Sequence, residues 1–461
     1  MDRESAVRAA RAASVPFFAD AASRARAARD FGRLRTGECL LVAEPETAEA
    51  CARLVTELRG RGIGCTVRGA GYSQSGQSVA FRTVSIGTRR LDRLGPIDRE
   101  RLEVTVGAGA TPRQLLAHLA ASDLCPPVLP LNLDMTIGGL LSAGGVGSSS
   151  HRHGTVASNV RSVTVVSGDG VLRTASAEEN PDLFDAVRGG IGRMGIIVEA
   201  RLGLRPAPRR VRVASFLYED RSAWIEDQAA LSELHPGFHL EGYCWFGGRG
   251  MRATPAGPAP VVAWSYGLAV GAGDDVPKEI QERALRVVRA TRRFEGYETD
   301  FQSFTRRYEP RFEGMVKDEL WELPHPWFEA VIPCPNLDGF LEDFLARLPP
   351  SVGDGHRVML VDASRCPPHF GAPPATRVAV VGVLPPGVPR ATLPATLAAL
   401  EPLDELVIGA SGRRYLSGFL GTNAERSVSR HFAPAGDSWT ASRRKYDPAG
   451  LFRSALTPGA D

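Results

Sequence analysis

Between residues 38 and 204, short apolar runs alternate with segments of helical periodicity. Apolar runs of roughly 4–8 residues between turn-forming residues predict strands, and apolar residues spaced three and four apart predict helices. Strands are expected at Leu40–Ala43, Gly62–Val67, Val84–Ile86, Leu102–Val106, Asn159–Val166, Val171–Thr174 and Gly195–Leu204. Helices are expected at Glu46–Arg59, Pro112–Ala121 and Pro181–Val187. This mixture predicts a domain of helices and sheet in the first half of the chain.

The two flanks of this region have different patterns. Residues Ala6–Ala28 have the periodicity of one amphipathic surface helix and lack the apolar core of a signal peptide. After Pro206 and Pro208, aromatic residues become more frequent up to about residue 420, which favours a second domain that walls a substrate cavity. Within it, the stretch Met251–Pro260 predicts a loop. The last segment contains a helix stop at Lys445-Tyr446-Asp447-Pro448.

Composition narrows the class of protein. The 461 residues are 43% hydrophobic and 23% charged, and a net charge of only +3 gives no reason to expect a nucleic acid partner. No apolar run is long enough to span a bilayer, so a cytoplasmic protein without a membrane partner is expected. Seven cysteines without a CxxC pair favour reduced thiols over disulfides or a zinc site. His151 and His153 lack a third ligand nearby, so no metal is expected.

Two glycine-rich loops carry the candidate chemistry. The first, Arg68–Gln77, follows a predicted strand, and its glycines let backbone N–H groups approach a phosphate closely. The second, Thr136–Gly147, has five glycines in its last ten residues. Either loop alone fits a tight turn about equally well, but the two together favour a bound diphosphate or flat ring. The segment Gly190–Gly195 fits GxGxxG, yet a helix precedes it and a strand follows it, so it predicts a helix-to-strand turn and no nicotinamide site.

Further short motifs accompany these loops along the chain. They are Asp30-Phe31-Gly32, Arg152-His153-Gly154, Ser158-Asn159-Val160, Val165–Gly170, Asn180–Phe184, Gly192–Ile197, Arg205–Pro208, Glu241-Gly242, His325-Pro326-Trp327 and Tyr446-Asp447-Pro448. Together with the two loops, they make the sequence similar to the FAD-linked oxidases of the vanillyl-alcohol oxidase superfamily, and within it to the cytokinin dehydrogenase branch. The resemblance runs nearly end to end and is thin between about residues 245 and 320.

The resemblance implies an α+β fold of two domains. A PCMH-type FAD-binding domain would comprise residues 34–207, after an N-terminal helical segment at 1–33. Residues 208–420 would form an α+β substrate domain on an antiparallel sheet, and residues 421–461 would return to the FAD domain. By position, the residues expected to contact FAD are Gly69, Ala70, Gly71, Tyr72, Ser73, Gln77, Thr136, Gly139, Ser142, Val146 and Ile197.

Two positions depart from the family's pattern. The family's FAD-linked histidine lies in a Gly-His-Ser element, where this sequence has Tyr72, and no cysteine stands between Leu129 and Gly147 for a sulfur link. The flavin is therefore expected to be held non-covalently. The family's catalytic aspartate stands five residues before the loop threonine, a position occupied here by Leu131. Asp134 would face the opposite side of an extended chain, so it replaces that base only if the backbone bends.

The implied activity is FAD-dependent oxidation of a small organic molecule, with hydride transfer to flavin N5 and reoxidation by oxygen or another electron acceptor. Tyr243, Glu241 and Asp134 are the candidates for the catalytic base, although Glu241 paired with an arginine and Tyr243 as cavity wall are equally compatible with the sequence. A positioned base contributes roughly 10²–10⁴-fold in rate, so its loss favours a substrate with an acidic or electron-rich C–H over an unactivated amine such as a cytokinin. Such a change of substrate class fits an enzyme of specialised metabolism. A redox-silent cyclase or a catalytically degenerate ligand-binding protein is the alternative.

Overall fold

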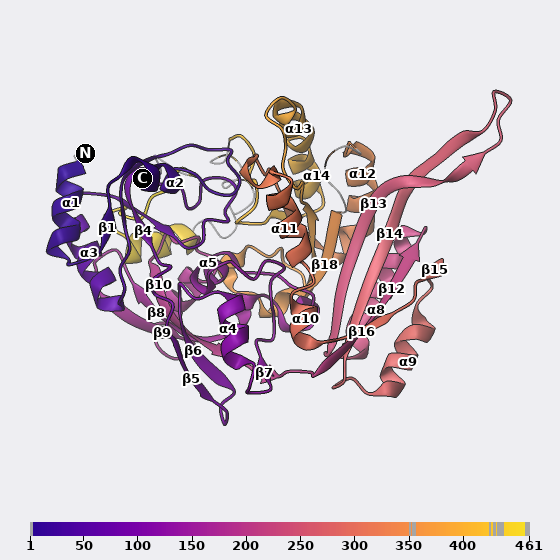
Figure 1. Cartoon of the computed structure of the whole chain (residues 1–461), viewed down its shortest axis with the longest axis horizontal. Coiled ribbons are helices and arrows are strands. Elements are labelled where there is room, and N and C mark those ends of the chain that lie inside the picture. The colour runs from indigo at the N-terminus through magenta and orange to yellow at the C-terminus, as the bar shows by residue number, and fades with distance from the viewer. Residues whose placement is uncertain are drawn as a thin grey trace.

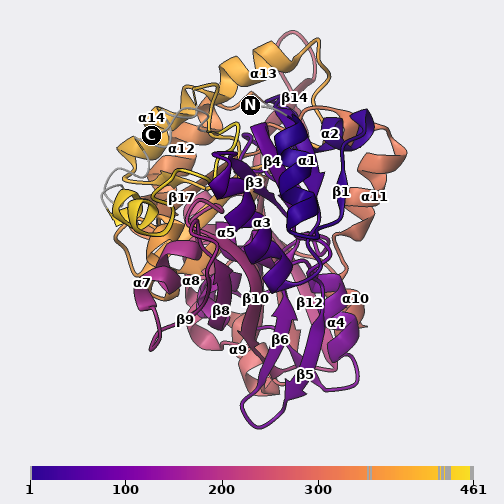
Figure 2. The ribbon, with the colours of Figure 1, turned by 90° about the vertical axis from the view of Figure 1, so that its left-hand side faces the viewer.

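The computed structural model describes residues 3–349, 352, 356–423, 426, 430 and 438–456, and its fold is a mixture of helices and sheets (Figure 1). In the first sheet β2 (Glu38–Ala43) and β3 (Cys65–Arg68) both lie parallel to β4 (Phe81–Gly87), and the short β1 (Phe17–Phe18) pairs with β2 at the edge. The helix α3 (Ala48–Gly60) carries the chain from β2 to β3, as a parallel connection requires. Figure 2 shows α1 (Arg3–Ala12) packed over α3, with α2 (Ala21–Ala27) beside it.

The second sheet is antiparallel and lies directly beside the first. Its strand order is β5-β6-β10-β8-β9. The bounds are β5 Leu94–Asp98, β6 Glu103–Gly107, β8 Val160–Val166, β9 Leu172–Ser176 and β10 Ile196–Gly203. Helices α4 (Pro112–Leu119), α5 (Ile137–Ala143) and α7 (Pro181–Val187) pack on it through a shared apolar core that includes Leu115, Leu141 and Leu183.

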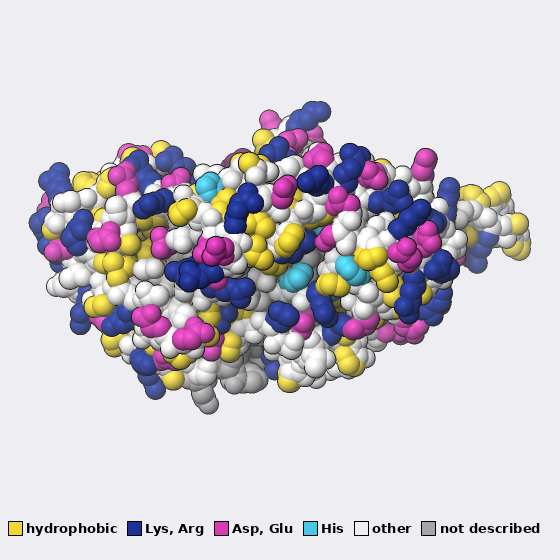
Figure 3. All heavy atoms as spheres, turned by 90° about the horizontal axis from the view of Figure 1, so that it is seen from below, with side chains coloured by type: hydrophobic (Ala, Val, Ile, Leu, Met, Phe, Trp, Pro, Cys, Tyr) yellow, Lys and Arg dark blue, Asp and Glu magenta, His cyan; other side chains and the backbone are white. Residues whose placement is uncertain are grey.

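A large antiparallel sheet dominates the other half of the molecule. Its strand order is β15-β12-β14-β13-β18-β19-β17-β20, with β16 paired to β12. The bounds are β12 Arg210–Tyr218, β13 Phe238–Arg252, β14 Ala259–Gly273, β15 Arg292–Arg293, β16 Tyr297–Asp300, β17 Phe328–Pro333, β18 His356–Asp362, β19 Arg377–Val383 and β20 Arg413–Arg414. Strands β13 and β14 extend beyond the rest of the sheet as a projecting hairpin, whose free end carries many apolar side chains (Figures 1 and 3).

The two faces of this sheet have different neighbours. One face packs against the helices α8 (Arg221–Leu234), α12 (Leu337–Arg347) and α14 (Leu403–Gly409), and side chains such as Leu240, Val358 and Val381 form its core. Residues one position along each strand point to the opposite face, which is turned towards the first half of the chain. The short helix α6 (Ser150–His153) packs against β18. The remaining helices are α9 Lys278–Val287, α10 Phe301–Thr305, α11 Glu309–Lys317 and α13 Leu393–Leu400. A small ladder joins β7 (Leu124–Cys125) to β11 (Arg205–Pro206).

The C-terminal segment returns to the first sheet. A helix over residues 438–446 ends at Tyr446, as the sequence predicts, and Asp447 then accepts hydrogen bonds from the N–H groups of Leu451 and Phe452 at 2.7 and 2.9 Å. Cys65 of β3 donates to the carbonyl of Leu451 at 2.8 Å, and Arg453 donates back to the carbonyl of Cys65 at 2.8 Å. The segment therefore extends the edge of the sheet from which the first glycine-rich loop emerges.

The helices and strands expected between residues 38 and 204 are confirmed, with boundary shifts of a few residues. The single helix expected over Ala6–Ala28 is wrong, because Ser14 adopts a left-handed φ of 54° and Pro16 has no N–H to continue the helix, so two helices flank the short β1. The loop expected over Met251–Pro260 is also wrong at both ends, since β13 and β14 stay paired up to Arg252 and Ala259. The strand β5 was not predicted, and Ile137–Ala143 of the predicted second loop form the helix α5, which Thr136 caps.

Two further properties concern the surface and the thiols. Within the described residues, no helix combines the length and the apolar character needed to cross a bilayer. The seven cysteines are free thiols, five of them buried, and burial raises the pKa of Cys51 to about 12. On the face shown in Figure 3, basic and acidic side chains are interspersed.

Candidate active site

A deep cleft separates the glycine-rich loops from the large sheet. About 1720 Å³ of space free of protein atoms lies within it, including the part open to solvent. Its lining combines backbone groups of the glycine-rich loops, apolar side chains and a few polar side chains, as is typical of a cofactor or substrate site. One wall is largely backbone from residues 67–78, 130–146 and 191–197, and the other is built from side chains of β17, β18 and β19 and their flanks.

The first glycine-rich loop is held in place from behind. Gly71 and Gly76 have φ of 80° and 87°, a region that side chains other than glycine rarely adopt. The carboxylate of Asp30 accepts hydrogen bonds from the hydroxyl of Ser73 and the N–H of Gly76, at 2.9 and 2.8 Å. Burial raises the pKa of Asp30 to about 6, although these hydrogen bonds oppose the shift. Gln77 reaches in the other direction and donates to the carbonyl of Leu416 at 2.7 Å.

The front of this loop suits a phosphate. Within the described part of the chain, the N–H groups of Ala70, Gly71 and Tyr72 donate no hydrogen bond. A Cβ added at Gly69 would lie 2.1 Å from the Thr136 hydroxyl, so only glycine lets the two loops approach so closely. Consecutive N–H groups aimed at a cleft form a nest for an anion, and the diphosphate of FAD fits this donor set.

The second loop forms the floor of the cleft. Thr136 caps α5 by accepting a hydrogen bond from the Gly139 N–H, and the helix ends at Gly144, whose φ is 107°. Gly145 follows with φ 74° and donates its N–H to the Tyr415 hydroxyl at 2.9 Å, across the cleft. All the residues that the sequence predicts for FAD line this one cleft: Gly69, Ala70, Gly71, Tyr72, Ser73, Gln77, Thr136, Gly139, Ser142, Val146 and Ile197.

Leu131, next to Asn132, and Tyr72 both line the cleft. The ring of Tyr72 packs against Phe31 and Trp321, with centroids 5.7 and 6.0 Å apart. Burial raises the pKa of the Tyr72 phenol. Tyr72 therefore presents a neutral phenol within an aromatic cluster at the cleft.

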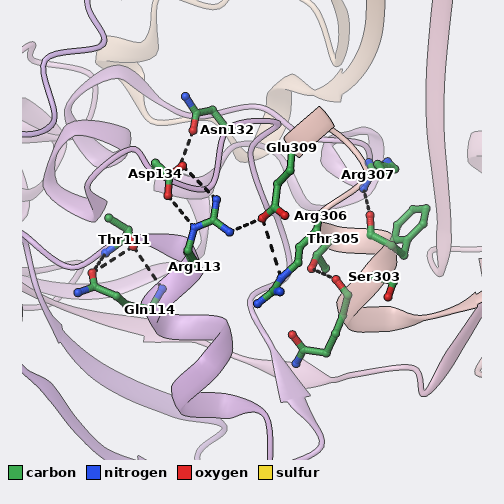
Figure 4. Close-up of polar contacts among 12 residues, drawn as sticks. Thr111, Arg113, Gln114, Asn132, Asp134, Ser303, Thr305, Arg306, Arg307 and Glu309 are labelled. Atoms are coloured by element: carbon green, nitrogen blue, oxygen red, sulfur yellow. Dashed lines mark hydrogen bonds and ion pairs between the residues drawn. The ribbon is translucent and has the colours of Figure 1, made fainter. Parts of the chain in front are cut away.

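Asp134 lies outside this lining. The chain turns there, and the guanidinium of Arg113 donates to both carboxylate oxygens of Asp134, at 2.7 and 3.0 Å (Figure 4). Arg113 also donates to Glu309 at the start of α11, so the group ties the two halves of the molecule together. The side chain of Asp134 is half exposed.

Glu241 and Tyr243 belong to a buried cluster behind the side-chain wall. Glu241 accepts hydrogen bonds from Arg307 and from the hydroxyls of Tyr308 and Tyr243, the last at 2.6 Å. Burial alone would raise the pKa of Glu241, but Arg307 and these hydrogen bonds lower it, so it stays ionised. Burial and the nearby Glu241 raise the pKa of both tyrosines, which therefore stay protonated.

The structure adds residues to the site that the sequence did not reveal. Tyr308, which lies 2.8 Å from the Tyr243 hydroxyl, and Arg357, which donates to Tyr308 at 2.8 Å, both line the cleft. Glu329 lines it too, and burial raises the pKa of its carboxyl to about 7, with Arg414 opposing the shift. Glu329 follows the His325-Pro326-Trp327 motif by two residues, which is the only sequence signal for it.

A comparison with protein families agrees with this geometry. A family model described as an FAD binding domain matches residues 39–176, which include both glycine-rich loops. The chain is an FAD-binding oxidoreductase related to the cytokinin dehydrogenases. The sequence-based expectations of FAD as cofactor and of an FAD-linked enzyme are thereby confirmed.

Individual relatives give the extent of the similarity. An uncharacterized oxidoreductase in the fasciation locus of Rhodococcoides fascians is 29% identical over 336 residues, which cover 72% of this chain and 74% of the relative. Cytokinin dehydrogenase 1 of Oryza sativa subsp. japonica is 28% identical, with 72% of this chain and 71% of the relative covered. Cytokinin dehydrogenase 6 of the same plant is also 28% identical, with 96% of this chain and 92% of the relative covered.

Proposed function

We propose that this protein oxidises a small organic molecule with non-covalently bound FAD. The observation that carries the proposal is the cleft itself, in which a glycine-rich backbone wall faces a wall of polar and apolar side chains. In this proposal residues 34–207 and the returning segment 421–461 hold FAD, residues 208–420 form the substrate domain, and residues 1–33 support the first glycine-rich loop. Bound FAD would supply an acceptor for hydride at N5, and oxygen or another acceptor would reoxidise it.

The proposed seat of the cofactor follows from the N–H donors of the first glycine-rich loop and from the lining of the cleft. The N–H groups of Ala70, Gly71 and Tyr72 would bind the diphosphate, with Ser73 and Gln77 fixing the loop. Gly139, Ser142, Val146 and Ile197 would contact the ring system from the floor of the cleft. The non-covalent linkage is supported by the phenol of Tyr72 and by the lack of cysteine between residues 129 and 147.

The side chains near the cleft bear on how the substrate loses its proton. Leu131 makes the expected base position apolar, and Asp134 is engaged with Arg113 outside the lining. Glu241 and Tyr243 are joined in a satisfied network, so we assign them the role of positioning Tyr308 and Arg357 at the cleft. Protonated tyrosines orient a substrate as hydrogen-bond donors, and they do not act as bases.

The lack of a base at position 131 of the cleft makes a cytokinin, after which several relatives are named, an unfavourable substrate. A molecule whose C–H is acidic or electron-rich needs less help from a base. Tyr72 and Leu131, which depart from the family's pattern, are both consistent with an enzyme of specialised metabolism that acts on such a substrate.

Anaerobic mixing tests the proposal. The FAD-loaded protein is mixed without oxygen with a cytokinin and, separately, with a panel of benzylic alcohols and phenols. Loss of the visible absorbance of oxidised flavin with a panel member, and not with the cytokinin, supports the proposal. A ligand that binds and is converted without bleaching the flavin would instead support the redox-silent alternative.

A further inference from the structure

A cross-strand row faces the cleft from the large sheet. Tyr243 on β13 is paired with Arg357 on β18, Arg357 with Gly382 on β19, and Gly382 with Glu329 on β17. Directly opposed residues of antiparallel strands project to the same face of the sheet. The neighbouring residues Val358, Val381 and Ala330 lie in the core on the other face, so this row points to the cleft, and Arg357, Gly382 and Glu329 all line it.

The glycine in the row opens a notch between two polar side chains. Adjacent strands lie about 4.8 Å apart, so the Cα atoms of Arg357 and Glu329 are separated by about 10 Å with no side chain between them. The row beside it is apolar, since Met359 pairs with Val380, and both of these line the cleft. A Cβ added at Gly382 would contact the Leu384 side chain at 3.5 Å and the Cγ of Glu329 at 3.7 Å without a clash, so the notch is a narrow gap bounded by these two side chains.

Arg357 and Glu329, at the two ends of the notch, have fewer polar partners than their side chains can bind. Arg357 donates to the Tyr308 hydroxyl, and in the described parts of the chain no carboxylate lies within ion-pair distance of it. Its guanidinium also lies 4.3 Å from the Tyr308 ring centroid, which fixes its direction. The carboxyl of Glu329 receives no hydrogen bond from any described residue, and burial raises its pKa to about 7. Polar groups withdrawn from water are unfavourable unless a ligand or water completes their hydrogen bonds.

We infer that Arg357 and Glu329 are the two polar ends of a substrate subsite over Gly382. The substrate class that fits is a slender molecule with an apolar body, an anionic group bound by Arg357, and a hydroxyl or amine that donates to Glu329. This inference rests on the proposed function, since it takes the glycine-rich wall as the seat of FAD and the sheet as the substrate's wall. Arg357 and Glu329 select the substrate, and Gly382 sets the thickness that the subsite accepts.

Matched probes test the subsite by binding alone. Calorimetry with FAD-loaded protein under anaerobic conditions compares 4-(hydroxymethyl)benzoate with its neutral amide, 4-(hydroxymethyl)benzamide, and with 4-methylbenzoate, which lacks the hydroxyl. We expect wild type to bind the hydroxymethyl carboxylate about tenfold or more tightly than either analogue, as one charged hydrogen bond provides. In Arg357→Gln, 4-(hydroxymethyl)benzoate should no longer bind more tightly than its amide. In Glu329→Leu, it should no longer bind more tightly than 4-methylbenzoate.

A second experiment fills the notch with a larger side chain at position 382. Gly382→Val should weaken all three probes by about tenfold or more, because its methyl groups fill the space between the polar ends. The matched control is Gly248→Val on β13, where a Cβ would meet nothing within 4 Å, and it should bind all probes as wild type does.

The outcomes separate the inference from the proposed function. Equal binding of carboxylate and amide by FAD-loaded wild type, or wild-type binding by Gly382→Val, would overturn the subsite. Loss of FAD in Gly382→Val or Glu329→Leu, measured by flavin absorbance, would mean that the notch holds the flavin, and would also overturn it. Wild-type protein that takes up no FAD would overturn the proposed function instead.

Discussion

The carboxylate of Asp30 accepts a hydrogen bond from the N–H of Gly76 at 2.8 Å, although 46 residues separate them in the chain. The same carboxylate oxygen accepts from the Ser73 hydroxyl. A residue of the N-terminal segment thus sets the curvature of the loop whose N–H groups face the cleft. The segment that precedes β2 therefore helps to stabilise the proposed cofactor-binding loop.

The burial of the Asp30 carboxyl predicts a pH dependence of stability, because burial raises its pKa although the hydrogen bonds from Gly76 and Ser73 oppose the shift. The pKa of Asp30 is raised from 3.8 to about 6 in the folded state, so its contribution is fully present below about pH 4 and is lost as pH rises through 6. The free energy of unfolding should fall by up to about 3 kcal/mol across this window. Asp30→Asn should remove that part of the slope, as measured by urea unfolding at a series of pH values. Asp92→Asn, at an exposed position, is the control and should keep the wild-type slope.

Gly71→Val should lose most of its bound FAD. Valine is strongly disfavoured at φ 80°, and its Cβ would meet the Arg68 guanidinium at 2.3 Å, so the loop must change shape. Flavin absorbance per protein after gel filtration measures the loss. Gly248→Val, at an open site on β13, should retain FAD, and the stabilisation of the wild type by added FAD should be absent from Gly71→Val. Full occupancy in Gly71→Val would show that the loop is not the cofactor's seat.

Acid precipitation should release the flavin completely from the wild type. The phenol of Tyr72 offers no imidazole nitrogen for a covalent link. Flavin fluorescence is measured in the supernatant and in the denatured band on a gel. Tyr72→Phe, which removes the hydroxyl and keeps the ring in its aromatic cluster, should behave in the same way. Fluorescence that remains with the denatured wild-type band, and disappears in Tyr72→Phe, would contradict the prediction.

Leu131→Asp should not accelerate the native reaction. A lone carboxylate at this position of the cleft lining would lose several kcal/mol of hydration, or take up a proton, once FAD and the substrate cover it. The rate of flavin bleaching by the native substrate, measured anaerobically, should fall or stay unchanged, and weak oxidation of an amine could appear. Leu131→Asn, similar in size but uncharged, is the control. A strong acceleration by Leu131→Asp alone would mean that the reaction needs a base at this position.

Removing the buried carboxylate behind the wall should destabilise the protein. Glu241→Ala leaves the Arg307 guanidinium without its partner in a site where the Glu241 side chain is only 5% exposed. Breaking a buried pair in this way costs about 3–5 kcal/mol. Glu233→Ala, which breaks an exposed pair with Arg377, should cost at most about 1 kcal/mol. Equal losses in the two variants, measured by chemical denaturation, would show that the network does not stabilise the fold.

Local signals explain which parts of the fold could be predicted. The helix over Pro181–Val187 was predicted to the residue, because proline at its first position and a periodic apolar face define both ends. The helix predicted over Ala6–Ala28 is too long because its periodicity continues through Pro16, although this proline and the left-handed backbone at Ser14 both interrupt the helix. The long hairpin was missed because its glycines and prolines resemble a loop, while pairing with the partner strand keeps them extended.

Some residues of the candidate site could likewise be predicted from the local sequence, and others could not. The cofactor loops are local in sequence, so their glycines and hydroxyls could be named in advance, and these residues line one cleft. Arg357, Gly382 and Glu329 meet only through the register of three strands, which is set by packing of the whole sheet. Tyr308 lies between two short helices in a stretch without a motif, and no pattern in the sequence could have revealed it.

The pairing of Cys65 with the returning segment at Leu451 and Phe452 has a kinetic consequence. The strand that leads into the first glycine-rich loop obtains these neighbours only after residues 451 and 452 have left the ribosome. Such long-range contacts close late and slow folding. We therefore expect nascent chains to capture FAD only after synthesis of residue 453, and limiting FAD during expression to trap a population in which everything but this edge has formed.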